Sequence, residues 1–398
     1  MSTAWTGGSE AALPSDRYSA TLAGRAWVPA NGAGTVAGPS VIAIREDGVV
    51  DLSTTFATMR DVFEADEPAK RLAAATGTTI GTLDELLTNT PPESRDESKP
   101  WLLSPIDLQV VKAAGVTFAV SMMERVIEER ARGDLEAAAV IRSTILAEIG
   151  SDLKSIKPGS DDAAKLKQFL IEQGLWSQYL EVGIGPDAEI FTKAPVLASV
   201  GTGVEVGVLS TSTWNNPEPE VVLAVSSTGR IVGATLGNDV NLRDVEGRSA
   251  LLLPKAKDNN ASGSLGPFIR FFDDGFDLDD VRQTTVTLEI DGVDGFTLSA
   301  TSPLSEISRD PVDLVAQLIG DHHQYPDGAV LYLGTLFAPI VDRSEKGKGF
   351  THRVGDVVRI SAPLLGTLVN RVQTSERCAP WRFGVAALMK NLAERRLL

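Results

Sequence analysis

The chain has 398 residues, 43% hydrophobic and 23% charged, which is the composition of a globular protein large enough for two domains. Its 53 acidic and 37 basic side chains give a net charge of −16, which argues against nucleic acid and anionic membranes as partners. The single cysteine, Cys378, excludes an intrachain disulfide. With no signal-peptide pattern and no apolar run that could span a membrane, we expect a cytoplasmic protein.

The first 100 residues predict a small N-terminal α+β domain. Residues 18–28 have a strand pattern, and residues 41–50 predict a hairpin turning at Asp47-Gly48. Two short helices are predicted over residues 56–64 and 68–75. Residues 88–100 are polar, charged and rich in proline, as linkers are. We therefore predict a boundary here, between domains of residues 1–100 and 101–398.

The second domain begins with a helical insertion of about residues 121–180. Apolar residues recur at helical spacing over residues 121–132 and 135–149. Pro158-Gly159 ends that run, and Ser160 is a good cap for a third helix that reaches Gln173. We expect this segment to be an elaboration between strands.

From residue 184 onwards the pattern is that of β structure. Short strands separated by turn residues are predicted over residues 204–209, 220–226, 231–236, 285–290, 329–333, 357–361 and 366–372. Many short strands at even spacing favour a β-sandwich or rolled barrel over a doubly wound sheet. The fold class predicted is therefore α+β, mostly β.

Three acidic residues stand at the ends of two neighbouring predicted strands. Glu218 and Glu220 are two residues apart, so on a strand their side chains point to the same face, and Asp239 closes the triangle if its strand is adjacent. Convergent carboxylates repel one another unless a hard divalent cation with oxygen ligands, Mg²⁺ or Mn²⁺, lies between them. A solvated acidic strand end is the alternative interpretation of the same pattern.

The order of the motifs resembles the fumarylacetoacetate hydrolase superfamily over residues 102–398. The motifs are, in order, E-x-E at 218–220, N-D-x-x-x-R-D at 238–244, Lys257 before Gly266-Pro267, Gly334-Thr335 after a strand, and residues 355–372. Residues 111–121, 124–134, 174–182 and 255–262 are more narrowly similar to the bacterial 2-keto-3-deoxy-pentonate dehydratases. The resemblance implies a β-sandwich roll with a helical insertion, and at least a homodimer, with dimer and tetramer both open.

The resemblance also implies the residues of a site. It gives Glu218, Glu220 and Asp239 as ligands of Mg²⁺, for which Mn²⁺ could substitute, and Lys257 and Glu124 as catalytic residues. The substrate-binding residues that it implies are Ser121, Lys193, Asn238, Arg243 and Thr335.

One departure from the superfamily pattern bears on the reaction. Hydrolases and decarboxylases of the superfamily carry G-x-N-Y-x-x-H-x-x-E, whose His and Glu form an acid–base pair. Here the frame runs from Gly115 to Glu124, and Ser121 stands in place of the histidine. This argues against a water activated by histidine, and so against hydrolysis of a C–C bond.

The reaction expected is therefore the dehydration of a small 2-keto sugar acid. A cation that chelates the acid would acidify its C3 protons, and Lys257 or Glu124 would remove one before the C4 hydroxyl leaves. The product expected from a 2-keto-3-deoxy-pentonate is 2,5-dioxopentanoate. The alternatives are a hydrolase of a 2,4-diketo-3-deoxy sugar acid, an oxaloacetate decarboxylase, and a sugar-acid binding protein without catalysis.

Overall fold

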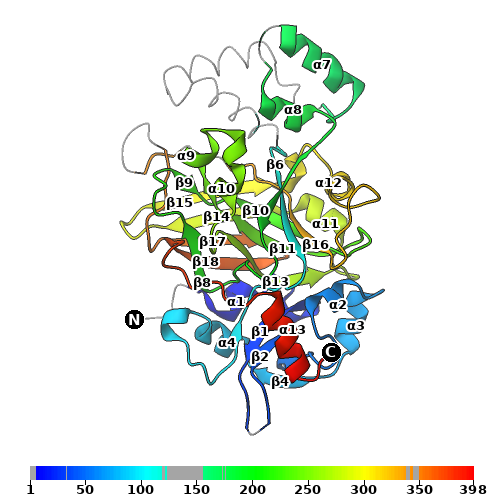
Figure 1. Ribbon diagram of the computed structural model, residues 1–398, viewed down its shortest axis with the longest axis vertical. Coiled ribbons are helices and arrows are strands. Elements are labelled where there is room, and N and C mark those ends of the chain that lie inside the picture. Colours follow the sequence, from blue (N-terminus) through cyan, green and yellow to red (C-terminus); the bar gives the residue numbers. More distant parts are fainter. Residues whose placement is uncertain are drawn as a thin grey trace.

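The computed structural model describes residues 6–32, 34–118, 122, 156–172, 174, 176–337, 341–343 and 349–398. Within these residues the strands form a long sheet, a five-stranded sheet and a two-stranded ribbon (Figure 1). Among the described helices, none has the length and apolar character that a membrane crossing requires.

The long sheet runs through the whole body of the molecule. Its strands, in spatial order, are β4 (Thr78–Gly81), β3 (Gly48–Asp51), β2 (Gly38–Arg45), β1 (Leu22–Val28), β13 (Gly263–Phe271), β11 (Ile231–Asp239), β10 (Pro219–Val225), β16 (Ala329–Tyr332), β6 (Val110–Gly115) and β7 (Glu189–Ala194), with β5 (Trp101–Leu102) paired to β1. The central strands β10, β11 and β13 are buried on both faces, which explains their nearly continuous apolar sequences.

The five-stranded sheet packs against one face of the long sheet. Its order is β15 (Thr297–Pro303), β14 (Thr285–Asp291), β17 (Val357–Ala362), β18 (Gly366–Thr374) and β8 (Val204–Val208). Apolar side chains of both sheets, among them Leu223, Leu236, Leu288 and Ile360, form one buried cluster between them. This arrangement of two packed sheets agrees with the predicted sheet-rich fold.

Helices lie around the two sheets (Figure 1). Their bounds are α1 (Gly8–Ala12), α2 (Met59–Phe63), α3 (Pro68–Ala74), α4 (Leu83–Asn89), α7 (Asp161–Glu172), α8 (Gln178–Ile184), α9 (Arg243–Glu246), α10 (Leu253–Lys257), α11 (Leu278–Gln283), α12 (Pro311–Leu318) and α13 (Val385–Glu394). Residues of α2 and α3 pack on the face that carries Val222 and Tyr332. A thin ribbon of β9 (Asn215–Asn216) and β12 (Asn241–Leu242) borders the mouth of β10.

The predicted helical insertion lies partly outside the described residues, because 123–155 are not among them. Its third predicted helix is confirmed as α7, and α8 follows it. Both helices stand at the end of the molecule opposite the N-terminal strands (Figure 1). The predicted boundary near residue 100 stays a prediction, while the structure shows that backbone hydrogen bonds join β1 to β13 across it.

Candidate metal centre

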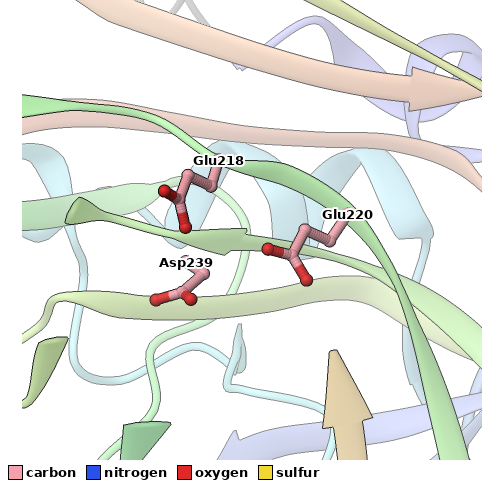
Figure 2. Close-up of side chains that lie close together, drawn as sticks. All are labelled: Glu218, Glu220 and Asp239. Atoms are coloured by element: carbon pink, nitrogen blue, oxygen red, sulfur yellow. The ribbon is translucent and has the colours of Figure 1, made fainter. Parts of the chain in front are cut away.

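The three predicted carboxylates converge at one end of the long sheet. Antiparallel pairing of β10 with β11 sets Glu220 opposite Gly237, and the main-chain N–H of Asp239 donates to the carbonyl oxygen of Glu218 at 3.0 Å. One carboxylate oxygen from each of the three acids lies within 4.8 Å of the others. Figure 2 shows the three side chains pointing toward a common space. The i, i+2 spacing of the two glutamates therefore produced the predicted convergence.

This cluster is buried, although the protein is rich in exposed acids. Glu218, Glu220 and Asp239 are only 7%, 2% and 1% exposed. Three buried carboxylates at this separation are unstable as free anions, so each of them must be compensated by protons, cations or hydrogen bonds. Their oxygen-only donor set is the kind that Mg²⁺ prefers in proteins. The residues present therefore fit a hard divalent cation.

Two buried lysines supply part of the compensation. Lys257, at the end of α10, places its Nζ 2.5 Å from Oε2 of Glu218 and 2.9 Å from Oδ2 of Asp239. Lys193, on β7, places its Nζ 2.8 Å from Oδ1 of Asp239. The ring of Phe191 lies beneath Lys257, with its centroid 5.5 Å from Nζ. The structure thus brings both predicted lysines to the acidic cluster.

Burial and neighbouring charges together set the pKa values of Asp239, Glu220 and Lys257. Burial alone would raise the pKa of Asp239, but Lys193 and Lys257 outweigh it and the pKa is lowered. The pKa of Glu220 is raised well above its usual value by burial and by the charges of Asp239 and Glu218. For Lys257, burial would lower the pKa, but Asp239 and Glu218 outweigh it and raise it. Lys257 is therefore protonated in this arrangement, and Glu220 holds a proton more readily than Asp239 does.

Main-chain and amide groups fix the orientation of the two glutamates. The main-chain N–H of Gly334 donates to Oε2 of Glu220 at 2.6 Å. Asn241 donates through its side-chain amide to Oε1 of Glu218 at 3.0 Å and to Oε2 of Glu246 at 2.6 Å. Thr117 donates to the carbonyl oxygen of Leu333 at 2.6 Å, just before Gly334. Asn241 and Thr117 lie within the motifs at 238–244 and 115–124, but neither was predicted to be a site residue.

The predicted substrate-binding residues occupy different places around the cluster. Asn238 accepts the main-chain N–H of Glu218 at 3.1 Å, and its side chain leaves the strand on the face opposite to Asp239. Arg243, at the start of α9, stacks on Trp214 with the guanidinium carbon 4.5 Å from the ring centroid. Thr335 is half-buried next to Gly334.

Two further predictions, Ser121 and Glu124, lie outside the described residues. Their roles stay predictions.

The chain is similar to proteins of the family that its sequence motifs resemble. Residues 184–373 match the family described as "Fumarylacetoacetate (FAA) hydrolase C-terminal". A probable 2-keto-3-deoxyxylonate dehydratase of Haloferax volcanii is 34% identical over 203 residues, which are 51% of this chain and 66% of that protein. The 2-dehydro-3-deoxy-D-arabinonate dehydratase of Saccharolobus solfataricus is 31% identical over 185 residues, which are 46% of this chain and 58% of that protein. The match thus spans less than two thirds of either relative.

A solved structure shows the same fold over almost all of its length. It is 2-keto-3-deoxy-D-arabinonate dehydratase complexed with magnesium and 2,5-dioxopentanoate, which is 21% identical, with a TM-score of 0.60 over 89% of this chain and 99% of that one. The superfamily resemblance is thus confirmed for residues 184–373, which match the fumarylacetoacetate hydrolase C-terminal family.

Proposed function

We propose that the protein is a magnesium-dependent dehydratase, a hydro-lyase, that acts on 2-keto-3-deoxy-D-pentonate. The substrate would be the xylonate or arabinonate derivative, and the product would be 2,5-dioxopentanoate, in non-phosphorylative pentose catabolism. The observation that carries the proposal is the buried cluster of Glu218, Glu220 and Asp239 with Lys257 bound across two of them. The names of the two relatives support the substrate class.

The three carboxylates would hold the cation, for which Mn²⁺ could substitute. When bound there, Mg²⁺ would supply Lewis-acid chemistry that draws electron density from a chelating 2-keto acid. A bound divalent cation would favour the ionised form of all three acids. If Lys193 and Lys257 stay protonated, these five side chains sum to −1, and the cation would bring the total to +1. That value complements the single carboxylate of a 2-keto sugar acid.

The chain's own groups would move the protons. Dehydration breaks the C3–H bond and the C4–O bond, and the C4 hydroxyl leaves as water after it accepts a proton; a proton shift from C5 then gives the aldehyde. The raised pKa of Lys257 favours its charged form, which suits a donor to a developing oxyanion. We therefore propose Glu124 as the base that takes the C3 proton, with Lys257 as the second candidate for this role.

A serine at position 121 supports elimination over hydrolysis. A hydrolase of a 2,4-diketo-3-deoxy sugar acid has to activate a water, and the frame from Gly115 to Glu124 lacks the histidine that does so in the superfamily. This hydrolase stays the second candidate.

We also propose that the protein works in the cytoplasm as a homodimer or homotetramer. Arg243 and Thr335 would bind the substrate.

The test is an assay of the purified protein with 2-keto-3-deoxy-pentonate and Mg²⁺, with the aldehyde product detected by a trapping reagent. We expect aldehyde formation that EDTA abolishes and Mg²⁺ restores, because the metal supplies the Lewis acid. Glu124→Gln and Lys257→Met should each lower kcat by about 10²–10⁴-fold at full metal occupancy. Near-normal turnover in both variants would refute the roles, and cleavage to pyruvate from a 2,4-diketo acid would favour the hydrolase.

A further inference from the structure

Lys193 is the most completely enclosed charged side chain beside the acidic cluster. It is 0% exposed, and its Nζ lies 2.8 Å from Oδ1 of Asp239, 2.9 Å from the carbonyl oxygen of Val240 and 2.6 Å from the carbonyl oxygen of Lys257. Nζ also donates to Oγ of Ser262 at 3.5 Å. A lysine ammonium has three N–H donors, so the three hydrogen bonds of Lys193, together with its ion pair to Asp239, leave no donor for a substrate.

The second lysine differs in this respect. Lys257 donates to Glu218 and Asp239, so the contacts described for it use two of its three donors. Lys257 is the last residue of α10, and its carbonyl oxygen accepts a hydrogen bond from Lys193. Lys257 can therefore still donate to a substrate. Lys193 instead holds the main chain of Lys257.

We infer that Lys193 is a positioning residue that fixes Asp239 and Lys257 and makes no contact with the substrate. This inference rests on the proposed function and differs from the substrate-binding role that the sequence suggested. Lys193 holds one oxygen of Asp239 while Lys257 holds the other, so the carboxylate is clamped from both sides. Through Val240 and Lys257 it also ties β11 to the end of α10.

The experiment compares Lys193→Met, Lys257→Met and the unaltered full-length chain. Lys255→Met is the matched control, because Lys255 is an exposed lysine of the same helix. Mn²⁺ binding is measured by electron paramagnetic resonance, and pyruvate binding at saturating Mn²⁺ by calorimetry. Lys193→Met should weaken Mn²⁺ binding by about 10–100-fold, as the loss of groups behind metal ligands does.

Pyruvate binding separates positioning from substrate contact. At saturating Mn²⁺, Lys193→Met should bind pyruvate within about threefold of the unaltered chain, whereas Lys257→Met should lose about tenfold or more, the cost of one charged hydrogen bond. A loss of that size in Lys193→Met, or an unchanged affinity for Mn²⁺, overturns the inference. An unaltered chain that binds Mn²⁺ but not pyruvate speaks against the proposed function, and the Mn²⁺ comparison still decides on Lys193.

A buried lysine can be needed for folding, so the unaltered protein provides a second measurement. A crystal structure with Mg²⁺ and pyruvate should keep Lys193 on Asp239, Val240 and Lys257. If Lys193 instead donates to the pyruvate, the inference is wrong, whether or not Lys193→Met folds.

Discussion

A single glycine places a main-chain donor on one of the proposed metal ligands. Gly334 has a φ of +89°, and a Cβ at this position would lie 2.0 Å from Oγ1 of Thr117. Its N–H donates to Glu220, and Thr117 binds the carbonyl oxygen of the preceding residue. The hydrogen bond from Thr117 thus holds the bend after β16, and the N–H of Gly334 in that bend holds the carboxylate of Glu220.

Gly334→Ala should be destabilising and should weaken metal binding. The left-handed conformation alone costs a non-glycine residue about 1–3 kcal/mol, and the collision with Thr117 adds to it. Gly295→Ala is the matched control, because Gly295 has a φ of +80° and open space around its Cβ position. We expect Gly334→Ala to unfold at lower urea and to bind Mg²⁺ more weakly than Gly295→Ala. Equal behaviour of the two variants in urea and in Mg²⁺ titration would contradict this account.

The sequence predicts the acids better than the groups that hold them. The E-x-E spacing of Glu218 and Glu220 is a local property of a strand, so it could be found without the fold. Lys193 on β7 contacts Val240, which follows β11, and Lys257 at the end of α10. These partners lie 47 and 64 residues away from it along the chain. No local pattern encodes such a contact, so only the structure shows which atoms Lys193 touches.

At the scale of elements, Arg343 and His352, which follow β16 in the chain, belong to a largely buried ionic network. Arg343 pairs with both oxygens of Asp356 and with Asp294, and Nδ1 of His352 lies 3.6 Å from Asp356. The main-chain N–H of His352 donates to Oδ1 of Asn215 at 3.2 Å, three residues before Glu218. The network therefore links the second sheet to the ribbon that borders the acidic cluster.

This network makes stability depend on pH through His352. Burial lowers the pKa of His352, and the attraction of Asp356 only partly opposes it. The unfolded chain then binds more protons than the folded one, so stability is complete above the unfolded pKa of about 6.5 and is lost as pH falls below it. His352→Phe should remove up to about 1.4 kcal/mol per pH unit of this dependence between pH 6.5 and the lower folded pKa.

Urea unfolding at pH 7.5, 6.5 and 5.5 checks this prediction. His322→Phe, which replaces an exposed histidine, is the matched control variant. A His352→Phe variant that loses as much stability between pH 6.5 and 5.5 as the unaltered chain would exclude His352 as the source. Below pH 4 the loss of stability comes from carboxylates such as Asp356. Burial would raise the pKa of Asp356, but Arg343 and His352 outweigh burial and lower it.

One of the strands that the sequence did not predict is central. Strand β13 lies between β1 and β11, yet residues 263–271 were not predicted as a strand. They contain Gly266-Pro267, and proline lacks the N–H that a central strand uses, so such a pair is typical of a turn or an edge. The ladder with β11 accommodates the pair by a register shift between Ala234 and Leu236. Tertiary pairing thus overrides the local signal.

At the scale of the whole molecule, the N-terminal strands and the strands of the acidic cluster share one sheet. β1 pairs with β13, and β13 pairs with β11, which ends at Asp239. The fully buried Arg270 of β13 forms an ion pair with Asp16. At the other terminus, α13 returns to the N-terminal strands, where Asn391 donates to the carbonyl oxygen of Ala37 at 2.7 Å (Figure 1).

A chain of residues 101–398 should therefore fail to fold as a stable unit. Removing residues 1–100 would expose the edge of β13 and the apolar face that α2 and α3 cover, including Val222 and Tyr332, and would leave Arg270 without Asp16. Unpaired central strands with apolar surroundings associate with one another. We expect aggregation on expression and no cooperative thermal transition by circular dichroism, with the full-length chain as the control. A soluble fragment that melts cooperatively and binds Mn²⁺ would instead support two independent domains that meet at residue 100.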